Sequence, residues 1–293
     1  MRSMPTAPRL VMVTTLCLCG ASLLWACGSG EDTLHTTPHR PDGAEAAATA
    51  GETAESAETG TPPVPGDTGV PAEIEVNAGE HFMHRLKVLP LIRVKNHPQM
   101  AVWCETAKGE FISTLFITER IGSQSWRGAP SDPTPAEEIR RKESLPVWAH
   151  RHGTVYADGL HLPTEDEPMP DGVTAATPTS SFTVRTALPA GHERLRVYLE
   201  VNNSTDFNDH YSEDAPAGSA TYSGGPWGSG QPALVYSGVI DLTDDGAAAQ
   251  RIDLELLGHA SPDGSTGEIY QDLDGVTTAL DIVEGVSIRL EEP

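Results

Sequence analysis

The sequence predicts an all-β fold: a β-sandwich with an immunoglobulin-like arrangement, long loops and one short helix near the C-terminus. Apolar and polar residues alternate in many short segments, and this period of two is that of a strand with one buried face. The 293 residues include 28 Gly and 24 Pro, and turn residues at this density between short strands are typical of sandwiches. Only 5% of the residues are aromatic, which argues against a compact helical enzyme that fills the whole length.

The strands are expected where the alternation is clearest. Between residues 195 and 201 every second residue is Leu or Val, and Arg196, Tyr198 and Glu200 stand between them. We therefore expect the apolar set in a core and the other three side chains in water. Further strands with one apolar face are expected at 82–88, 100–104, 252–256 and 286–290. Strands that are apolar on both faces are expected at 111–117 and 233–240.

Helices and loops fill the spaces between these strands. Apolar residues recur at helical spacing from Val276 to Val283, after Asp274, and Gly285 is placed to end a helix there. A single turn of surface helix is expected at 137–143. Long ordered loops on a rigid sandwich are where function tends to lie, and the long connections here span about residues 119–145, 151–180 and 202–232.

The first 26 residues are expected to be a lipoprotein signal peptide. Arg2 and Arg9 precede an apolar run at 10–24, which is too short for a membrane span of about 20 predominantly apolar residues. The run ends in Leu-Trp-Ala-Cys followed by Gly. This resembles the bacterial lipobox, whose cysteine is diacylated and becomes the first residue, so we expect a lipid on Cys27. The alternative is an ordinary secretory signal cut near Ala26, which leaves Cys27 free.

Residues 27–75 are expected to form a disordered tether. This stretch is rich in Ala, Thr, Gly, Glu and Pro and has almost no large apolar residue, so burial cannot offset the entropy of an ordered chain. Residues 76–293 remain, and a single all-β domain of this length is common. We thus expect one sandwich domain that the tether holds away from the lipid surface.

Two histidines suggest a metal site that the sequence does not complete. His150 and His152, on an extended segment, would point to the same side, which is a spacing that metals use, and His161 lies near in sequence. No third ligand is fixed by the spacing. We therefore favour solvent-facing histidines and expect no metal.

The acidic side chains are not expected to form a calcium site, and the thiol of Cys104 is not expected to be a nucleophile. Asp206, Asp209 and Glu213 carry the oxygen ligands that calcium binds, but a chain with 42 Asp and Glu residues produces such clusters freely. We expect them in an ordinary loop. Cys104 alternates with apolar neighbours, and we expect a small core residue there and not a nucleophile.

One segment resembles the acceptor motif of exported flavoproteins. Residues 171–177 read Asp-Gly-Val-Thr-Ala-Ala-Thr. The motif Asp-x-x-Ser/Thr-Gly-Ala-Thr is recognised by an FAD-dependent transferase that joins FMN to the last Thr through a phosphoester. In this alignment Thr177 is the acceptor, Asp171 and Thr174 are the recognition residues, and Ala175 stands where the pattern has Gly. The alternative is a polar turn that leads into the next strand.

Several short segments occur in a fixed order along the expected domain: 99–105, 108–111, 145–148, 171–178, 198–202, 230–236 and 277–279. They include Gln-Met-Ala-Val-Trp-Cys-Glu and Leu-Pro-Val-Trp. Together they resemble the predicted periplasmic proteins grouped as domain-of-unknown-function family 2271. The resemblance covers about residues 98–288 and implies an exported protein. The family has no established activity, so the resemblance implies no catalytic residue.

Two functions agree with these patterns. The first is a lipid-anchored extracytoplasmic binding or scaffold module without enzymatic activity or cofactor, whose partners are the membrane and another envelope protein. The net charge of −23 repels polyanions, so we expect no nucleic-acid partner. Gly follows the lipidated cysteine, in place of the Asp that retains lipoproteins in the inner membrane of enteric bacteria. We therefore expect the outer membrane, with the domain facing the periplasm or the cell surface.

The second function is that of an extracytoplasmic redox protein with FMN attached covalently to Thr177. Flavin electron transfer requires shielding of the ring, which Trp148, Tyr156 and Trp227 on neighbouring loops could supply. Only the motif at 171–177 supports this function, so we favour the first.

Overall fold

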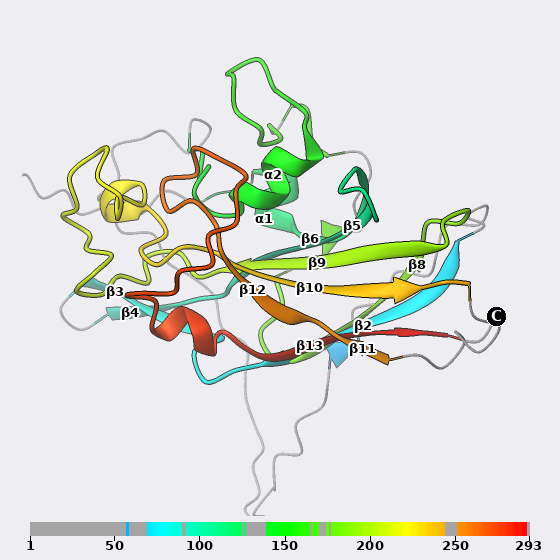
Figure 1. Ribbon diagram of the computed structural model, residues 1–293. Coiled ribbons are helices and arrows are strands. Elements are labelled where there is room, and N and C mark those ends of the chain that lie inside the picture. Colours follow the sequence, from blue (N-terminus) through cyan, green and yellow to red (C-terminus); the bar gives the residue numbers. More distant parts are fainter. Residues whose placement is uncertain are drawn as a thin grey trace, which may run out of the picture. The chain divides into compact units, whose positions relative to one another are not determined.

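Figure 1 shows the computed structural model of the chain. It describes residues 57–58, 69–89, 92–124, 126, 139–164, 166–169, 174–175, 177–243 and 251–291. All of these belong to one unit, Thr53–Pro293, whereas the other unit, Met1–Glu52, lies outside the described ranges. The expected signal peptide, the expected lipid site at Cys27 and most of the expected tether therefore lie outside the described residues.

The described part of Thr53–Pro293 is an all-β sandwich, as the sequence predicts (Figure 1). One sheet has the strand order β1, β8, β2, β13, β11, with the bounds Ala57–Glu58, Phe182–Leu188, Val70–Ala78, Val283–Leu290 and Arg251–Asp253. The other has the order β12, β10, β9, β5, β6, β7, with the bounds Glu255–His259, Leu234–Asp241, Arg194–Asn202, Gln99–Thr106, Phe111–Thr118 and Thr174–Ala175. A separate hairpin pairs β3 (His84–Leu89) with β4 (Ile92–Asn96).

Neighbouring strands run antiparallel except in two short parallel pairings, β1 with β8 and β6 with β7. The strand order does not confirm the immunoglobulin-like arrangement. Most expected strands are present, although the segment at 252–256 is divided between β11 and β12. The first long strand, β2, begins at Val70, inside the segment expected to be tether.

The main core lies between the two sheets. The apolar residues of β9 that the alternation selects are fully buried, and Leu199 has an exposed fraction of 0%. They belong to one cluster with the inward-facing residues of the opposite sheet, which include Ala72, Ile74 and Val76. Phe116 and Phe182 meet across the sandwich with ring centroids 5.5 Å apart. The expected core face of the strand at 195–201 is therefore confirmed.

A second core covers the other face of the six-stranded sheet. We call residues 139–164 and 166–169, which include α2 (Pro146–His152), the covering layer; α2 lies above β5, β6 and β9 in Figure 1. Side chains of this layer and of the sheet form one buried cluster, which includes Trp103, Trp148, Tyr198, Leu145 and Leu162.

The expected exposure of the outer face of β9 is wrong for two of its three residues. Tyr198 and Glu200 have exposed fractions of 7% and 0%, and only Arg196 is exposed. The physical reason is the covering layer, which lies over this face and excludes water from it.

The helices differ from those expected. α2 and the short α1 (Glu119–Ser123) both occupy segments in which loops or extended chain were expected. A 3₁₀ turn, η2 (Gly225–Trp227), lies in the third long connection. The expected surface helix at 137–143 is wrong for its described residues 139–143, which are irregular and include the buried Glu143.

The helix expected near the C-terminus is shorter than its pattern suggests. It is the 3₁₀ helix η3 (Thr278–Asp281). Val283 already begins β13 and pairs with Ala78, so the chain becomes extended before a full α-helix forms. Gly285 does not end a helix; it lies within β13, where the register with β2 shifts.

The outer face of the five-stranded sheet is polar. Arg289 and Arg251 form ion pairs with Glu73 and Glu75 of β2 at 2.6 and 2.8 Å. Exposed pairs of this kind contribute about 0–1 kcal/mol each, so this face contributes solubility more than stability. Among the described residues no helix is long and apolar enough to cross a membrane.

Candidate functional site

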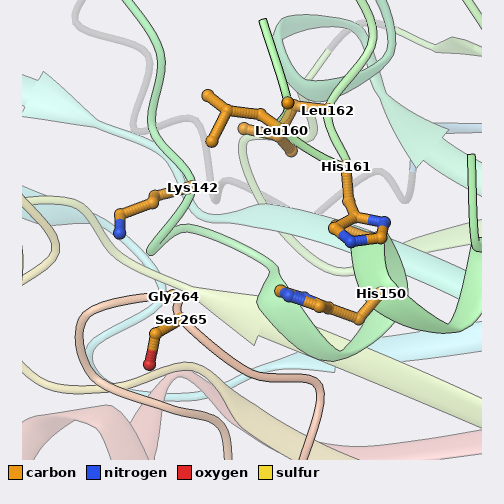
Figure 2. Close-up of a pocket in the computed structure, with 9 residues that line it drawn as sticks. Lys142, His150, Leu160, His161, Leu162, Gly264 and Ser265 are labelled. Carbon is orange, nitrogen blue, oxygen red and sulfur yellow. The ribbon is translucent and has the colours of Figure 1, made fainter. Parts of the chain in front are cut away.

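A pocket of about 310 Å³ opens at the covering layer (Figure 2). It lies where three segments far apart in sequence meet: the chain before α2, the loop after α2, and the connection between β12 and η3. Its lining consists of Lys142, Ala149, His150, Gly159, Leu160, His161, Leu162, Gly264 and Ser265.

Helix α2 is positioned by a glutamate of the sheet below it. Its N-cap, Leu145, offers no side-chain acceptor to the first turn, and Pro146 stands at its first position. The carboxylate of Glu200 instead accepts hydrogen bonds from the backbone N–H groups of Val147 at 3.1 Å and Trp148 at 2.7 Å. Glu200 of β9 thus supplies acceptors for two N–H groups that have no partner within the helix.

Glu200 has no exposed surface, and its burial raises the pKa of its carboxyl group to about 8. The two backbone hydrogen bonds favour the carboxylate and lower the pKa, but by less than burial raises it. The group therefore binds a proton at a pH at which a glutamate in water is ionised.

The C-terminal end of α2 is held by a second buried glutamate. Arg151 forms an ion pair with Glu105 of β5 at 3.1 Å, and the indole N–H of Trp103 donates to the same carboxylate at 2.9 Å. The Trp103 ring stacks on Tyr198 with centroids 5.0 Å apart. Both ends of a seven-residue helix are thus fixed to the sheet by buried polar groups, which a helix this short needs because it is marginal alone.

The connection between β12 and η3 packs closely at two glycines, against α2 at one and against the chain before α2 at the other. A Cβ on Gly267 would lie 2.5 Å from Cβ of His150, and a Cβ on Gly264 would lie 2.3 Å from the carbonyl oxygen of Lys142. Gly264 also has φ +68°, a backbone conformation that favours glycine. The close packing at these two positions therefore requires glycine.

Two histidines lie next to each other at one side of the pocket (Figure 2). The rings of His150 and His161 have centroids 4.4 Å apart and an interplanar angle of 32°. Nδ1 of His150 donates to the carbonyl oxygen of Pro146 at 2.8 Å. Nδ1 of His161 is buried without a hydrogen-bond partner. Burial, and next the charge of His150, lower the pKa of His161, so its ring is neutral at pH 7.

The extended segment assumed for His150 and His152 is wrong, and the expected solvent-facing histidines are half-buried. The segment is helical, and residues two apart point to different sides of a helix. His152 packs instead between Phe111 and Trp148, with centroid distances of 5.2 and 5.8 Å. The structure therefore brings together His150 and His161. Within the described ranges, no group of three or more His, Cys, Asp or Glu side chains could hold a metal ion.

The acidic residues considered for calcium are not gathered into a site. The carboxylate of Asp206 is buried and accepts hydrogen bonds from Gln231 at 2.9 Å and from the hydroxyl of Thr278 at 2.8 Å. Asp209 and Glu213 are exposed. Asp206 thus joins the loop after β9 to η3, and burial raises the pKa of its carboxyl group.

Cys104 is a core residue, as expected. Its exposed fraction is 0%, and its Sγ lies 3.3 Å from the hydroxyl of Ser113. Burial raises the pKa of the thiol, which disfavours the reactive thiolate form.

The flavin-acceptor motif is described only in part. Asp171 lies outside the described residues, and Thr174 with Ala175 forms β7, which pairs in parallel with Ile117–Thr118 at the edge of the six-stranded sheet. Thr177 is half-buried. Of the aromatic residues expected to shield a flavin, Trp148 is unsuited, because it is 1% exposed and its indole N–H donates to Thr114 at 3.0 Å.

The residues that fix the pocket are not those that the sequence singled out. Glu200 and Glu105 carry no local signal, because each acts on a helix about 50 residues away in the chain. One signal for α2 was present: Pro146 at the first helical position and Gly153 after the last, where φ is +81°. This spacing is typical of a helix start and stop.

No protein-family model matches the chain, and no curated protein or solved structure matches it. The resemblance to family 2271 therefore stays a prediction.

Proposed function

We propose that the chain is a lipid-anchored extracytoplasmic binding protein whose ligand site is the pocket beside α2. The observation that supports this most is the second core. A two-sheet sandwich needs only the face between its sheets to be apolar, yet here the outer face of one sheet is also buried beneath a helix and loops. Glu200 and Glu105 add buried polar contacts that fix that layer. Such support makes a pocket preformed, which lowers the entropy cost of binding.

The pocket suits a small polar ligand. Its volume of about 310 Å³ is at the lower end of ligand sites, about 300–1,000 Å³. Leu160 and Leu162 supply an apolar wall, while two imidazoles, Ser265 and the cationic Lys142 supply polar groups. A ligand that combines a short apolar body with a carboxylate or hydroxyl group matches this lining.

Pocket occupancy is tested by saturation-transfer NMR on the full chain with acetate, glycine, succinate and glucose as probes, in the presence of EDTA. We expect at least one probe to give a signal that Leu160→Trp abolishes, because the larger side chain fills the pocket. Leu280→Trp is the matched control, since Leu280 is 37% exposed and does not line this pocket. Equal signals for all three proteins, or no signal for any probe, would contradict the ligand site.

The lipid anchor is tested separately by labelling cells with a clickable fatty acid. Only a thiol at residue 27 can take the diacylglyceryl group, so Cys27→Ala should carry no label and should leave the membrane fraction. Equal labelling of the wild-type chain and Cys27→Ala would contradict the anchor without bearing on the pocket.

A further inference from the structure

We propose that the hairpin of β3 and β4 is a docking surface for a bilayer that carries anionic lipid headgroups. The proposal goes beyond the ligand pocket, and it rests on the proposed function in one respect: the lipid on Cys27 would hold the hairpin close to a membrane. Its support comes from the charge of the hairpin, from the register of the two strands and from the exposed apolar residue Val94.

The hairpin is cationic, although the chain as a whole is strongly acidic. Between Glu80 and Glu105 the sequence has no Asp or Glu, whereas the whole chain has 42. The same stretch contains four Lys and Arg residues, and all of them lie in β3 or β4. A net charge of −23 repels anions from most of the molecule. An anionic partner would therefore contact the protein at the hairpin.

The register of the two strands groups these charges on one face. Arg85 pairs with Lys95, and Lys87 pairs with Arg93. Residues directly opposite each other, and residues two apart within a strand, share a face. Arg85 and Lys95 are both exposed. Like charges in opposite positions destabilise a strand pair, and neither strand contains an acidic residue that would neutralise them. An anionic surface would remove this repulsion.

The opposite face is attached to the domain at its base and is uncovered further out. Nδ2 of Asn96 donates to the carbonyl oxygen of Ser204 at 3.2 Å. Nδ1 of His84, which pairs with Asn96, lies 3.8 Å from the carboxylate of Asp206. Val94 is two residues from Asn96 on the same face, yet 48% of its surface is exposed. Among the described strands, β3 and β4 pair only with each other, and a lone hairpin is marginally stable in water.

A bilayer surface fits both faces of the hairpin. Segments that lie in the membrane interface bury apolar side chains at the edge of the acyl region, while Lys and Arg reach the headgroups with their long side chains. The sequence between Lys87 and Arg93 is Val-Leu-Pro-Leu-Ile, which has no charge that would oppose this burial. Exposed apolar residues bordered by cations are typical of surfaces that bind anionic membranes.

The anchor and the hairpin can reach the same membrane. The hairpin lies at the end of the sandwich where β2 ends (Figure 1), so it is separated from the expected tether by the nine residues of β2, or about 30 Å. About 40 residues separate Cys27 from the start of β2, and a random coil of this length spans about 35 Å. The tether is therefore long enough for the hairpin end to turn toward the bilayer.

The test uses the acylated full chain reconstituted in two kinds of vesicle: phosphatidylcholine alone, and phosphatidylcholine mixed with the anionic phosphatidylglycerol. Val94→Cys carries an environment-sensitive fluorophore. It is the labelled residue because an acylated Cys27 has no free thiol and Cys104 is fully buried. Val155→Cys is the matched control for the label, since Val155 lies in the loop after α2 and is 60% exposed.

We expect emission from residue 94 to shift to shorter wavelength on the anionic vesicles alone, and emission from residue 155 to stay unchanged. Each Lys or Arg near an anionic surface contributes about fivefold to binding. The double variant Arg85→Gln/Lys95→Gln should therefore lower the ratio of docked to undocked protein at least about tenfold. Lys108→Gln/Arg196→Gln also removes two exposed charges, and it should dock as the wild type does.

Equal emission from residue 94 on the two kinds of vesicle, or equal losses in the two double variants, would overturn the membrane site. An equal shift that grows with the number of chains per vesicle would assign the hairpin to a second copy of the chain. An equal shift that is independent of this number would assign it to the chain's own acidic segment. The fatty-acid label tests the anchor and the NMR screen tests the pocket, so failure of docking is distinguishable from failure of the proposed function.

Discussion

Glu200→Gln should change how the free energy of unfolding depends on pH, and not only its magnitude at one pH. Burial raises the pKa of Glu200 from 4.5 to about 8 in the folded protein. Between these two values the folded state keeps a proton that the unfolded state releases, so stability decreases as pH rises. One pKa unit corresponds to about 1.4 kcal/mol, and the shift therefore removes on the order of 5 kcal/mol between pH 4.5 and 8.

Glutamine has nearly the same shape but no charge to lose. At pH 5 the variant should be less stable than the wild type by about 1–3 kcal/mol, because its NH₂ group faces an N–H donor and leaves either Val147 or Trp148 without an acceptor. Above pH 8 the variant should be more stable than the wild type, because only the wild type holds a buried charge there. Glu143, whose pKa burial raises to about 7, is present in both proteins and its effect cancels to first order.

The assay is urea unfolding of the wild type, Glu200→Gln and Arg196→Ala at half-unit steps from pH 5 to 9. Arg196 lies on the same strand and is exposed, so its variant should follow the wild-type pH curve. A stability difference between wild type and Glu200→Gln that stays constant across this range would refute the reasoning, because it would mean that Glu200 ionises at an ordinary pKa in the folded protein.

Two further predictions concern the main core and the flavin motif. Leu199→Ala should lower the free energy of unfolding by about 2–5 kcal/mol through lost burial and a cavity, whereas Arg196→Ala should change it by under about 0.5 kcal/mol; similar melting shifts for the two would contradict the assigned faces. If the covalent-flavin alternative holds, co-expression with an FMN transferase should add one FMN to Thr177, with more on Ala175→Gly and none on Thr177→Ala. Intact-protein mass spectrometry without an adduct on wild type and Ala175→Gly would exclude it.

The sandwich was predictable because its main core follows a local rule. Each strand that faces the opposite sheet shows its buried side by alternation, so Leu199 and its apolar neighbours could be placed without any knowledge of their partners. The same rule failed on the other face of β9. Tyr198 and Glu200 are amphipathic or charged residues, which suggests exposure, and only contacts with α2 show why they are buried.

Only some of the pocket residues could be predicted, because the pocket is formed by contacts between segments far apart in the sequence. The histidine spacing drew attention to the right segment, but the partner of His150 is His161 and not His152. That choice follows from the helical form of residues 146–152, which in turn depends on a carboxylate 52 residues further along the chain. Pro146 and Gly153 indicate the helix locally, but no local pattern shows the carboxylate that holds it. The close approaches of Gly264 and Gly267 are likewise set by the packing of one connection on another.

The central claim is that the covering layer is a fixed part of the fold and therefore forms a preformed pocket. Hydrogen–deuterium exchange of the full chain tests this directly, by comparison of peptides that cover 145–152 in α2 and 195–201 in β9. A seven-residue helix does not persist alone, so protection of its amides must come from Glu200 and the second core. The account predicts that α2 exchanges nearly as slowly as β9. Exchange of α2 at the rate of an unstructured peptide, with β9 still protected, would contradict it.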